Sequence, residues 1–405
     1  MRNNAVSVRM GKDIYQFLLQ PDGTYTAPPG STLSLTKVSG AYQLKQRLGN
    51  SINFDASGKA ANITDVDGKA MTFNYNTNGT LNYVEDCYAR RYTFAYNGTH
   101  ITGVTDNTSP ARSISFGYDT ANWNLTSATD PEGKLSYFDY SVSGDPGSTT
   151  AGEHRIVRLR NHDGETITQN VWDGLGRVER QFLHGDTNKT FRLYYTGRDN
   201  FEVNPQGGVT HYYYDERGRA SGSRDAEGNL SAIGYDGQDR VVSRTSGANE
   251  TTVYHYDNAS NLTQIDHPRG GGSTIMAYDS LNRLDLVTDP NGVQTDYVYF
   301  AGGNDAGKDR PQSAIHAKGT TEQSTTTYAY WQSGAAAGRA QTITDGDGLV
   351  TQKTYDSYGQ PDVTTAPGGF ATDQNYDARG NLTAVTDPRG KTISYTYNLR
   401  RQVIA

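Results

Sequence analysis

The chain has 405 residues, with 37 Lys and Arg against 44 Asp and Glu, so its formal net charge is −7. The basic residues are scattered rather than gathered into a stripe, which argues against a nucleic-acid partner, and no apolar run approaches the ~20 residues that a membrane-spanning helix needs. The single cysteine, Cys87, excludes an internal disulfide and a cysteine-based metal site, and we expect it to be a packed thiol.

Residues 1–53 are the least regular part of the sequence. Turn residues at Asp22-Gly23 and Pro28-Pro29-Gly30 separate short alternating runs there. We expect a β-rich N-terminal cap or incomplete first units, because the end of a repeat array needs an atypical unit to cover its core and its edge strand. The start lacks the apolar centre of a signal peptide, and the sequence leaves open whether the chain is a piece of a longer protein.

Over residues 54–405 an aromatic residue recurs at a nearly constant spacing. These phase aromatics are Phe54, Tyr75, Tyr96, Tyr118, Tyr140, Trp172, Tyr195, Tyr214, Tyr235, Tyr256, Tyr278, Tyr299, Tyr330, Tyr355, Tyr376 and Tyr397. Ten of their fifteen intervals are 21 or 22 residues, and the other five are 19, 23, 25, 31 and 32. Such a period predicts a repeat protein that grows along one direction as one body.

Each repeat contains two expected strands and two expected turns. In residues 278–300 a Tyr-Asp pair opens a turn, a short aliphatic strand follows, and an Asp-Pro-x-Gly turn leads into a Thr/Tyr-rich strand that ends at the next Tyr. The second strand alternates, as in residues 71–75, which predicts one buried face on which the phase tyrosines stack into an aromatic ladder. In the first strand Leu284 and Val287 stand three apart, which predicts a bulge or coverage of both faces.

Three insertions interrupt the repeats, at residues 141–157, 301–326 and 333–338. Their small and polar composition predicts surface loops. Because insertions into repeats usually project from one face, we expect these loops to form the variable surface on which a partner binds.

The number of strands constrains the shape of the sheet. About thirty strands at ~4.8 Å each would make a flat sheet ~145 Å wide, whereas open twisted sheets seldom exceed ~10 strands without curling. We therefore expect an all-β fold in which one continuous antiparallel sheet of repeated β-hairpins curls into a spiral barrel or shell around an interior.

The recurring Tyr-Asp pair, with Gly-Arg and Asp-Pro-x-Gly downstream, resembles the RHS/YD-repeat family. Good local matches lie at residues 214–219, 172–177 and 376–382, the last leading to 386–390. The resemblance covers residues 50–405, and it is specific because the motif recurs along the chain.

The resemblance implies a long β-sheet that spirals into a hollow shell, as in secreted bacterial toxins, insecticidal complexes and the extracellular part of animal teneurins. Such shells commonly enclose a toxic C-terminal domain. The resemblance therefore implies a secreted or cell-surface bacterial protein whose partner is a C-terminal toxin or effector domain, or the remaining shell, outside this chain. The sequence departs from the family in lacking an RHS-associated core signature, a self-cleaving aspartate motif and a divergent toxin tail, so we expect a shell without its cargo.

Recurring carboxylates suggest two readings: acid/base pairs for glycoside cleavage, or residues that serve every unit by bonding turn amides or a nearby Arg. We favour the second for Asp215, Asp236, Asp257, Asp279, Asp356 and Asp377. The eight histidines show no metal-ligand spacing, and the Gly-rich segments at 207–208 and 270–272 lack the Lys of a phosphate loop. Residues 345–348 lack the closing Glu of a calcium loop. We therefore expect no catalytic residues, no cofactor, no metal and no enzyme activity.

The three tryptophans divide into two kinds. Trp172 takes the place of a phase Tyr and should be packed, whereas Trp123 and Trp331 stand off phase near turns, where they either pack or stack on a sugar ring. The leading hypothesis is a non-enzymatic shell for encapsulation or presentation. Its rival is a carbohydrate-binding or adhesive cell-surface module that uses these aromatics and the inserted loops, with glycans as partners.

Overall fold

The computed structural model describes residues 4–47, 49–121, 123–141, 154–303 and 308–405. These residues form 36 β-strands and one short 3₁₀ turn, η1, at Pro268–Gly270. The predicted all-β class is confirmed.

Among the described residues, the N-terminal strands form the one region with a fully buried apolar core. The first five strands are Ala5–Met10 (β1), Asp13–Leu19 (β2), Tyr25–Thr26 (β3), Ser34–Val38 (β4) and Ala41–Lys45 (β5). Strands β1–β3 make a small antiparallel sheet, and its Val8 and Phe17 pack against Leu35 of β4 and Leu44 of β5. Two layers of sheet therefore enclose apolar side chains here.

From β4 to β36 each strand pairs antiparallel with the next, which gives one continuous ladder of 33 strands. The strands from β6 to β20 are Ser51–Phe54 (β6), Ala60–Thr64 (β7), Ala70–Tyr75 (β8), Leu81–Glu85 (β9), Arg91–Asn97 (β10), His100–Asp106 (β11), Ser113–Tyr118 (β12), Leu125–Thr129 (β13), Leu135–Tyr140 (β14), Ile156–Arg160 (β15), Thr166–Trp172 (β16), Val178–Leu183 (β17), Thr190–Tyr195 (β18), Asp199–Val203 (β19) and Val209–Tyr214 (β20). The remaining strands are Ala220–Arg224 (β21), Leu230–Tyr235 (β22), Val241–Thr245 (β23), Thr251–Tyr256 (β24), Leu262–Asp266 (β25), Ser273–Tyr278 (β26), Leu284–Thr288 (β27), Gln294–Tyr299 (β28), Pro311–His316 (β29), Ser324–Tyr330 (β30), Ala340–Thr344 (β31), Val350–Tyr355 (β32), Pro361–Ala366 (β33), Phe370–Tyr376 (β34), Leu382–Thr386 (β35) and Thr392–Ser394 (β36). The predicted sheet of repeated hairpins is confirmed.

A bulge recurs where the second strand of one unit meets the first strand of the next. Between β26 and β27, Ala277 pairs with Leu286 but Tyr278 pairs with Leu284, so Asp285 is an extra residue without a partner. The same shift precedes Tyr75, Tyr118, Tyr235, Tyr256 and Tyr376. The bulge accounts for aliphatic residues three apart, and it adds local twist that helps the ladder to curl.

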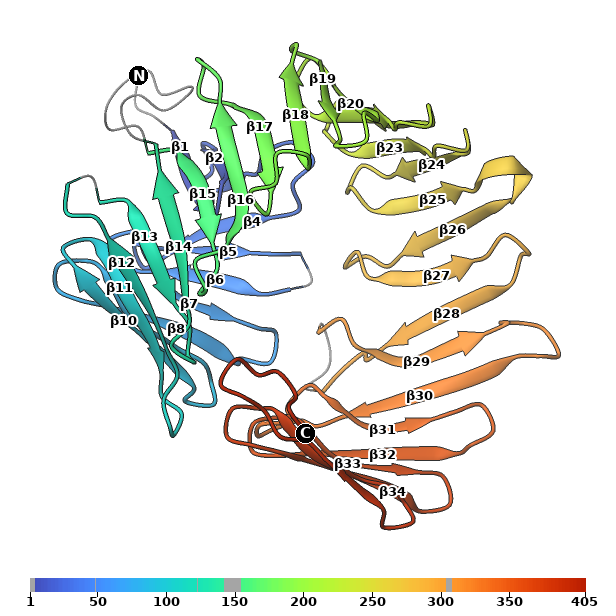
Figure 1. Ribbon diagram of the computed structural model, residues 1–405. Coiled ribbons are helices and arrows are strands. Elements are labelled where there is room, and N and C mark those ends of the chain that lie inside the picture. Colours follow the sequence, from blue (N-terminus) through green and yellow to red (C-terminus); the bar gives the residue numbers. More distant parts are fainter. Residues whose placement is uncertain (1–3, 48, 122, 142–153, 304–307) are drawn as a thin grey trace.

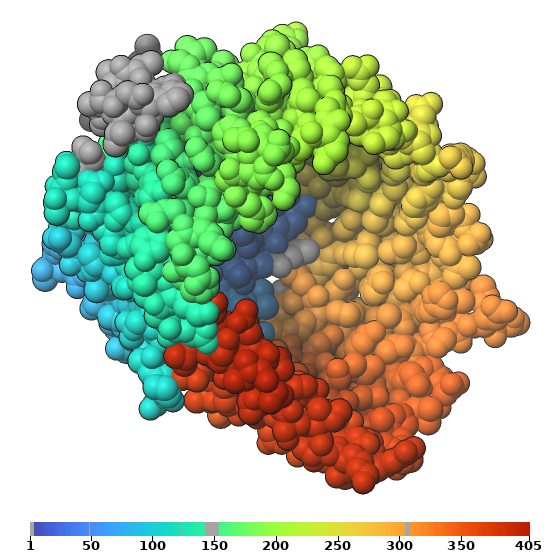
Figure 2. Space-filling view, in the orientation of Figure 1, coloured from blue at the N-terminus to red at the C-terminus, as the bar shows by residue number. Residues whose placement is uncertain are grey.

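The ladder winds around a hollow (Figures 1 and 2). The ribbon runs around the ring from the blue N-terminal strands to the red C-terminal strands, which return to the cyan region formed by β8–β14. Figure 2 shows the hollow in the middle of the ring, with blue N-terminal residues at its far side. Within the described ranges no hydrogen-bonded ladder joins β36 to β4, so the sheet is a spiral that keeps both edge strands.

Most of the ladder lacks a second covering layer. Among the described residues, Ala317 is the one buried hydrophobic residue outside the N-terminal core. On the face that the alternation predicts to be buried, Met71, Ile114 and Ile393 are 43%, 40% and 61% exposed. The prediction of a buried face is therefore wrong at the ends of the second strands far from the Tyr-Asp turns, because only lateral neighbours cover those side chains.

Two boundaries differ from those expected. The ladder begins at Ser34, and β1–β3 form a separate sheet before it. Residues 311–316, inside the predicted loop 301–326, form β29 and pair with β28 and β30. The sequence does not predict β29 as a strand, because Ile315 is its one large aliphatic residue. Residues 142–153 and 304–307 of the insertions lie outside the described residues.

Candidate functional site

Each Tyr-Asp turn is held by its aspartate. Asp279 Oδ1 accepts hydrogen bonds from the amides of Leu281 and Arg283, both at 2.9 Å, and Asp279 Oδ2 accepts one from Arg283 Nε at 2.7 Å. Burial raises the pKa of Asp279, but the amide and guanidinium of Arg283 outweigh burial and hold that pKa below its usual value. The six aspartates that all bond amides of their own turns are Asp215, Asp236, Asp257, Asp279, Asp356 and Asp377. Their predicted role in the turns is confirmed.

The next phase tyrosine completes this arrangement. The guanidinium carbon of Arg283 lies 4.1 Å from the ring centroid of Tyr299, and the Tyr299 hydroxyl donates to the carbonyl of Leu284 at 2.8 Å. The same two contacts occur at Arg177 with Tyr195, Arg219 with Tyr235, and Arg240 with Tyr256. In these four places one unit is thus joined to the next by a hydroxyl hydrogen bond and a cation–π contact.

The expected ladder of stacked tyrosines does not form. Among the described residues, no two consecutive phase tyrosines are in ring contact. Arg or Lys instead lies over some of the phase rings, such as Tyr75 and Tyr299. Consecutive phase residues lie two strands apart, which is ~10 Å and beyond the reach of ring pairs. The prediction is wrong because each repeat contributes two strands. The first strand of the next unit therefore lies between consecutive phase tyrosines in the sheet.

The two edges of the ribbon meet where the sheet has completed one revolution. We call residues 47–132 the first revolution, residues 259–401 the second revolution, and their junction the seam. Hydrogen bonds across the seam join residues that lie from 212 to 271 positions apart. The seam contacts are Arg47 with Ala259 and Asn261, Asp67 with Lys308 and Arg310, Lys69 and Tyr88 with Ala335, Thr108 and Pro110 with Arg379, and Asp130 with Arg400. In each contact, a turn at the Asp-Pro-x-Gly position of the repeat in the first revolution meets a turn at the Tyr-Asp position in the second.

Asp67 is the most enclosed acidic group that forms an ion pair across the seam. Its side chain is 10% exposed and forms ion pairs with Lys308, at 3.2 Å, and with Arg310. Burial raises the pKa of Asp67, but hydrogen bonds and charge attraction from the two basic side chains lower it below its usual value. Asp67 therefore stays ionised and ties the two revolutions together.

The insertion at residues 333–338 also lies in the seam. Lys69 Nζ donates to the carbonyls of Ala335 at 3.0 Å and Ala337 at 2.6 Å, and the Tyr88 hydroxyl donates to Ala335 at 3.1 Å. Lys308 and Arg310 come from the insertion that precedes β29. In the described residues, these two insertions contact the chain's own first revolution.

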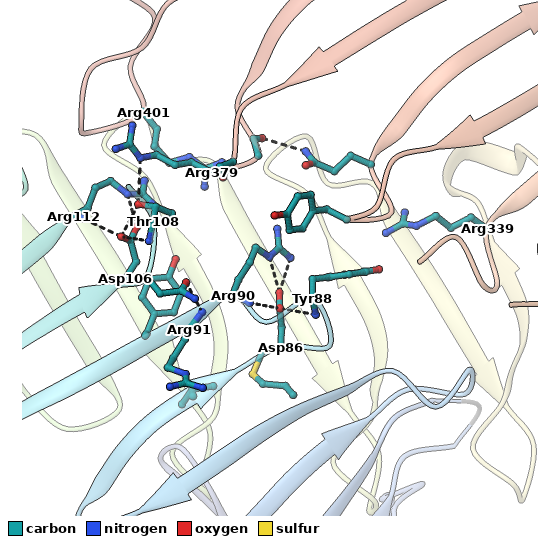
Figure 3. A pocket seen from close by; sticks show the side chains of 18 residues that line it. Asp86, Tyr88, Arg90, Arg91, Asp106, Thr108, Arg112, Arg339, Arg379 and Arg401 are labelled. Atoms are coloured by element: carbon teal, nitrogen blue, oxygen red, sulfur yellow. Dashed lines mark hydrogen bonds and ion pairs between the residues drawn. The ribbon is translucent and has the colours of Figure 1, made fainter. Parts of the chain in front are cut away.

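A cavity of about 370 Å³ opens beside these contacts (Figure 3). First-revolution turns at residues 86–92 and 106–112 line one wall, and residues 358–360, 378–380, Arg339 and Arg401 of the second revolution line the other. On the first wall Asp106 is 6% exposed at its side chain and binds Arg112 Nε at 2.6 Å. Sequence periodicity could not locate this cavity, since it depends on which turns meet after one revolution.

The three tryptophans differ in the structure. Trp172 Nε1 donates to the carbonyl of Ile156 at 3.2 Å, as a phase Tyr hydroxyl would, which confirms its place in the repeat. Trp331 is half-buried, and its Nε1 donates to Lys353 O at 3.1 Å. Trp123 is 41% exposed and stacks on His100, with 4.5 Å between ring centroids. Of the three, Trp123 is the one that presents an exposed ring.

Cys87 lies in the turn between β9 and β10 and is exposed. The expectation of a packed thiol is therefore wrong, because no second layer covers this turn. In the described ranges, no three His, Cys, Asp or Glu side chains gather as a metal site would require. That part of the chain also holds no helix with the length and apolar character needed to cross a membrane.

Comparisons with known proteins point to the same family as the sequence. The RHS Repeat family model matches residues 235–274 and 376–405, and no curated protein matches the chain. A crystal structure of TcdB2–TccC3 is 12% identical over 99% of this chain and 29% of its own length, with a TM-score of 0.39. A TcdB2–TccC3 structure without the hypervariable C-terminal region has 10% identity, 99% and 30% coverage and a TM-score of 0.44.

A third solved structure is a Tc holotoxin pore from Photorhabdus luminescens with a mutated TccC3. It is 11% identical over 96% of this chain and 26% of its own length, with a TM-score of 0.42. The chain thus spans less than a third of the length of these three proteins. The family model confirms RHS repeats at residues 235–274 and 376–405.

Proposed function

We propose that this RHS-repeat chain is part of the wall of a hollow β-shell that encloses a toxin or effector domain of a secreted or cell-surface bacterial protein. The observation that carries the proposal is the seam, where turns of the second revolution are fastened to turns of the first at five separate places. A sheet sealed to itself in this way can surround a volume without filling it. Containment requires such a wall, whereas a simple spacer does not.

The wall itself is proposed to be non-enzymatic. The recurring aspartates that could have served as acid and base accept hydrogen bonds from their own turn amides. The pKa is lowered in five of them, Asp215, Asp236, Asp257, Asp279 and Asp377. Burial raises the pKa of Asp236, for example, but hydrogen bonds from the amide and side chain of Arg240 outweigh burial. A general acid would need a raised pKa.

Enclosure can be tested with a protease-sensitive reporter domain fused after Ala405. We expect a protease to cleave the reporter more slowly when it is fused to the chain than when it is free. The matched control carries Asp67→Ala and Arg400→Ala, which remove two of the seam contacts and should restore fast cleavage. Equal cleavage rates in the fused and free reporters would reject enclosure by this chain.

A second candidate function, a carbohydrate-binding or adhesive module, is favoured by one observation. Trp123 keeps 41% of its surface exposed while His100 supports its other face, and an exposed aromatic ring can stack on a sugar. A glycan array should separate the two functions. Reproducible binding that Trp123→Ala abolishes and Trp331→Ala leaves unchanged would establish the carbohydrate function, and an array without such binding would remove it.

A further inference from the structure

The seam cavity holds an excess of positive charge. Its lining contains six arginines and two aspartates. The first-revolution arginines each bind a carboxylate: Arg90 with Asp86 at 2.7 Å, Arg91 with Glu85 at 2.6 Å, and Arg112 with Asp106 at 2.6 Å. Six arginines less these three carboxylates leave three positive charges, and all three belong to the second revolution.

These three are Arg339, Arg379 and Arg401, and their hydrogen-bond and ring partners are neutral. Burial raises the pKa of Asp377, but hydrogen bonds from Asn381 and, to a smaller extent, the charge of Arg379 lower it. Arg379 donates across the seam to Thr108 Oγ1 at 3.3 Å and to Pro110 O at 2.7 Å. Arg401 donates to an asparagine amide oxygen at 2.7 Å and to a backbone carbonyl at 3.1 Å. Arg339 lies over a tyrosine ring, with 5.5 Å to its centroid. In the part of the chain that the structure describes, none of the three has a carboxylate within ion-pair distance.

The positive charge arises because these three turns depart from the pairing used elsewhere. In a regular turn such as 279–283, the Asp after the phase Tyr binds an Arg four residues later. Trp331 and Asn398 stand in that Asp position in the turns that carry Arg339 and Arg401. In the turn of Arg379, the position four residues after the Asp is filled by Asn381, which binds the Asp side chain itself. Three turns that line the same cavity therefore each carry an arginine without an ion pair among the described residues.

We propose that the seam cavity binds an elongated phosphate-bearing polyanion, such as a polyphosphate chain, through Arg339, Arg379 and Arg401. The planar guanidinium group can donate two parallel hydrogen bonds to a phosphate group, and a cavity of about 370 Å³ lies within the usual range for small-molecule sites. Figure 3 shows Arg379 and Arg401 at one end of the cavity and Arg339 at the other. Positive charge at both ends favours a ligand with negative charge distributed along its length.

An occupant of this cavity touches both revolutions. Tyr88 and Tyr358, one from each revolution, are in edge-to-face contact with 6.3 Å between ring centroids in the same lining. Because the site exists only when the two walls meet, a bound polyanion stabilises the closed seam, and the stabilisation grows with the logarithm of the ligand concentration relative to Kd. This role concerns the wall and does not depend on what the shell encloses.

The test uses the purified chain, with tripolyphosphate as the probe and calorimetric titration at constant ionic strength as the measurement. We expect saturable binding of one equivalent, a raised melting temperature, and slower amide hydrogen exchange on both sides of the seam, at residues 86–90 and 378–381. The double variant Arg339→Gln with Arg401→Gln should bind about tenfold or more weakly, since it removes two charge-assisted phosphate contacts. Neither side chain bonds a described residue of the first revolution, so the variant should stay folded, which circular dichroism checks.

The matched control is Arg389→Gln, an exposed arginine in a turn outside the cavity. It should bind as the unmodified chain does. Binding that does not saturate, equal weakening by the control, or exchange protection on one side of the seam only would overturn the proposal. A parallel titration with ATP distinguishes free polyphosphate from a nucleotide: tighter binding of ATP would assign the tyrosine rings to the base, and tighter binding of tripolyphosphate would assign the site to the anion alone.

Discussion

Phe17 and Leu44 in the N-terminal region have no exposed surface, whereas the phase aromatics of the ladder, such as Tyr256, stay half-buried. In the N-terminal region a three-stranded sheet covers β4 and β5, so apolar burial stabilises the structure. Along most of the ladder no second layer exists, and neighbouring units are joined by turn aspartates, arginines and tyrosine hydroxyls. A hollow wall explains why the ladder is stabilised by polar contacts within the sheet. An apolar core that filled the interior would remove the space that the wall surrounds.

The largest effect should come from the N-terminal core. Phe17→Ala should lower the free energy of unfolding by about 3 to 5 kcal/mol, because it leaves a cavity among fully buried side chains. Phe370→Ala is the matched control, since Phe370 is 61% exposed on the ladder, and it should cost less than about 1 kcal/mol. Guanidinium melts measure both. Similar losses of unfolding free energy in the two variants would mean that apolar burial does not stabilise the N-terminal region more than the ladder.

The next effect tests how a half-buried tyrosine stabilises the ladder. Tyr256→Ala should cost about 2 to 3 kcal/mol, less than a fully buried aromatic, because it removes partial burial, the contact with Arg240 and the hydrogen bond to Val241 O. Tyr256→Phe keeps the ring and should cost about 1 kcal/mol, the usual net value of one hydrogen bond. If the phenylalanine variant lost as much as the alanine variant in denaturant melts, the hydroxyl alone would hold neighbouring units together.

The sequence predicts an interaction of this structure when its residues lie close together along the chain and recur with the repeat. The phase tyrosines, the hairpins, the bulge and the turn role of Asp279 are local and periodic, so the sequence predicts them. The exposure of Met71 and Ile393 was missed because alternation shows that a face exists and does not show what covers it. The seam was missed because its pairs lie 212 to 271 positions apart without a periodic signal. One sign of the arginines without an ion pair is visible in the sequence. Asn398 stands where a regular turn has the Asp that binds an Arg four residues later.

Acid should separate the seam from the N-terminal core, because the core contains no titrating contact among its buried side chains. Burial raises the pKa of Asp106, but hydrogen bonds from the Arg112 amide, the Thr108 hydroxyl and the Arg112 guanidinium lower it to about 2. Since the folded pKa lies below the usual 3.8, this stabilisation is present above about pH 4 and is lost as the pH falls through about 2. At 1.36 kcal/mol per pKa unit, it amounts to about 2 kcal/mol.

The measurement is the free energy of unfolding at pH 7 and at pH 2 for the unmodified chain and for Asp106→Asn. The variant should be less stable at pH 7, and the difference should shrink towards pH 2 as the native carboxyl becomes protonated. Asp347→Asn, at an exposed turn position, is the control and should change little. A difference between Asp106→Asn and the unmodified chain that stayed constant with pH would show that the ionised carboxylate is not the source of the stabilisation.

A smaller effect sharpens the account of the ordinary turns. Asp279→Ala removes two hydrogen bonds to turn amides and the ion pair with Arg283, and should cost about 1 to 2 kcal/mol, as the loss of a helix cap does. Asp279→Asn keeps an oxygen that can accept from the amides and should recover about half of the loss. Denaturant melts of the pair decide the point, and equal losses would assign the stabilisation to the charge on Asp279.

The smallest effect should come from Asn258→Ala in a neighbouring Tyr-Asp turn. Asn258 is exposed and makes no side-chain hydrogen bond within the described part of the chain, while the positive-φ position of that turn belongs to Ser260, at φ 63°. Alanine at residue 258 therefore meets neither a lost contact nor backbone strain, and the change in unfolding free energy should stay within ~0.5 kcal/mol. Ser260→Gly is the useful companion, because glycine relieves the positive φ but removes the hydroxyl that accepts a hydrogen bond from Arg240 at 3.2 Å. The two effects oppose each other, so the change in stability should be small. A loss above about 1 kcal/mol for Asn258→Ala would mean that more than the aspartate and the backbone stabilises the turn. The contrast between a core stabilised by apolar burial and turns stabilised by their aspartates would then be wrong.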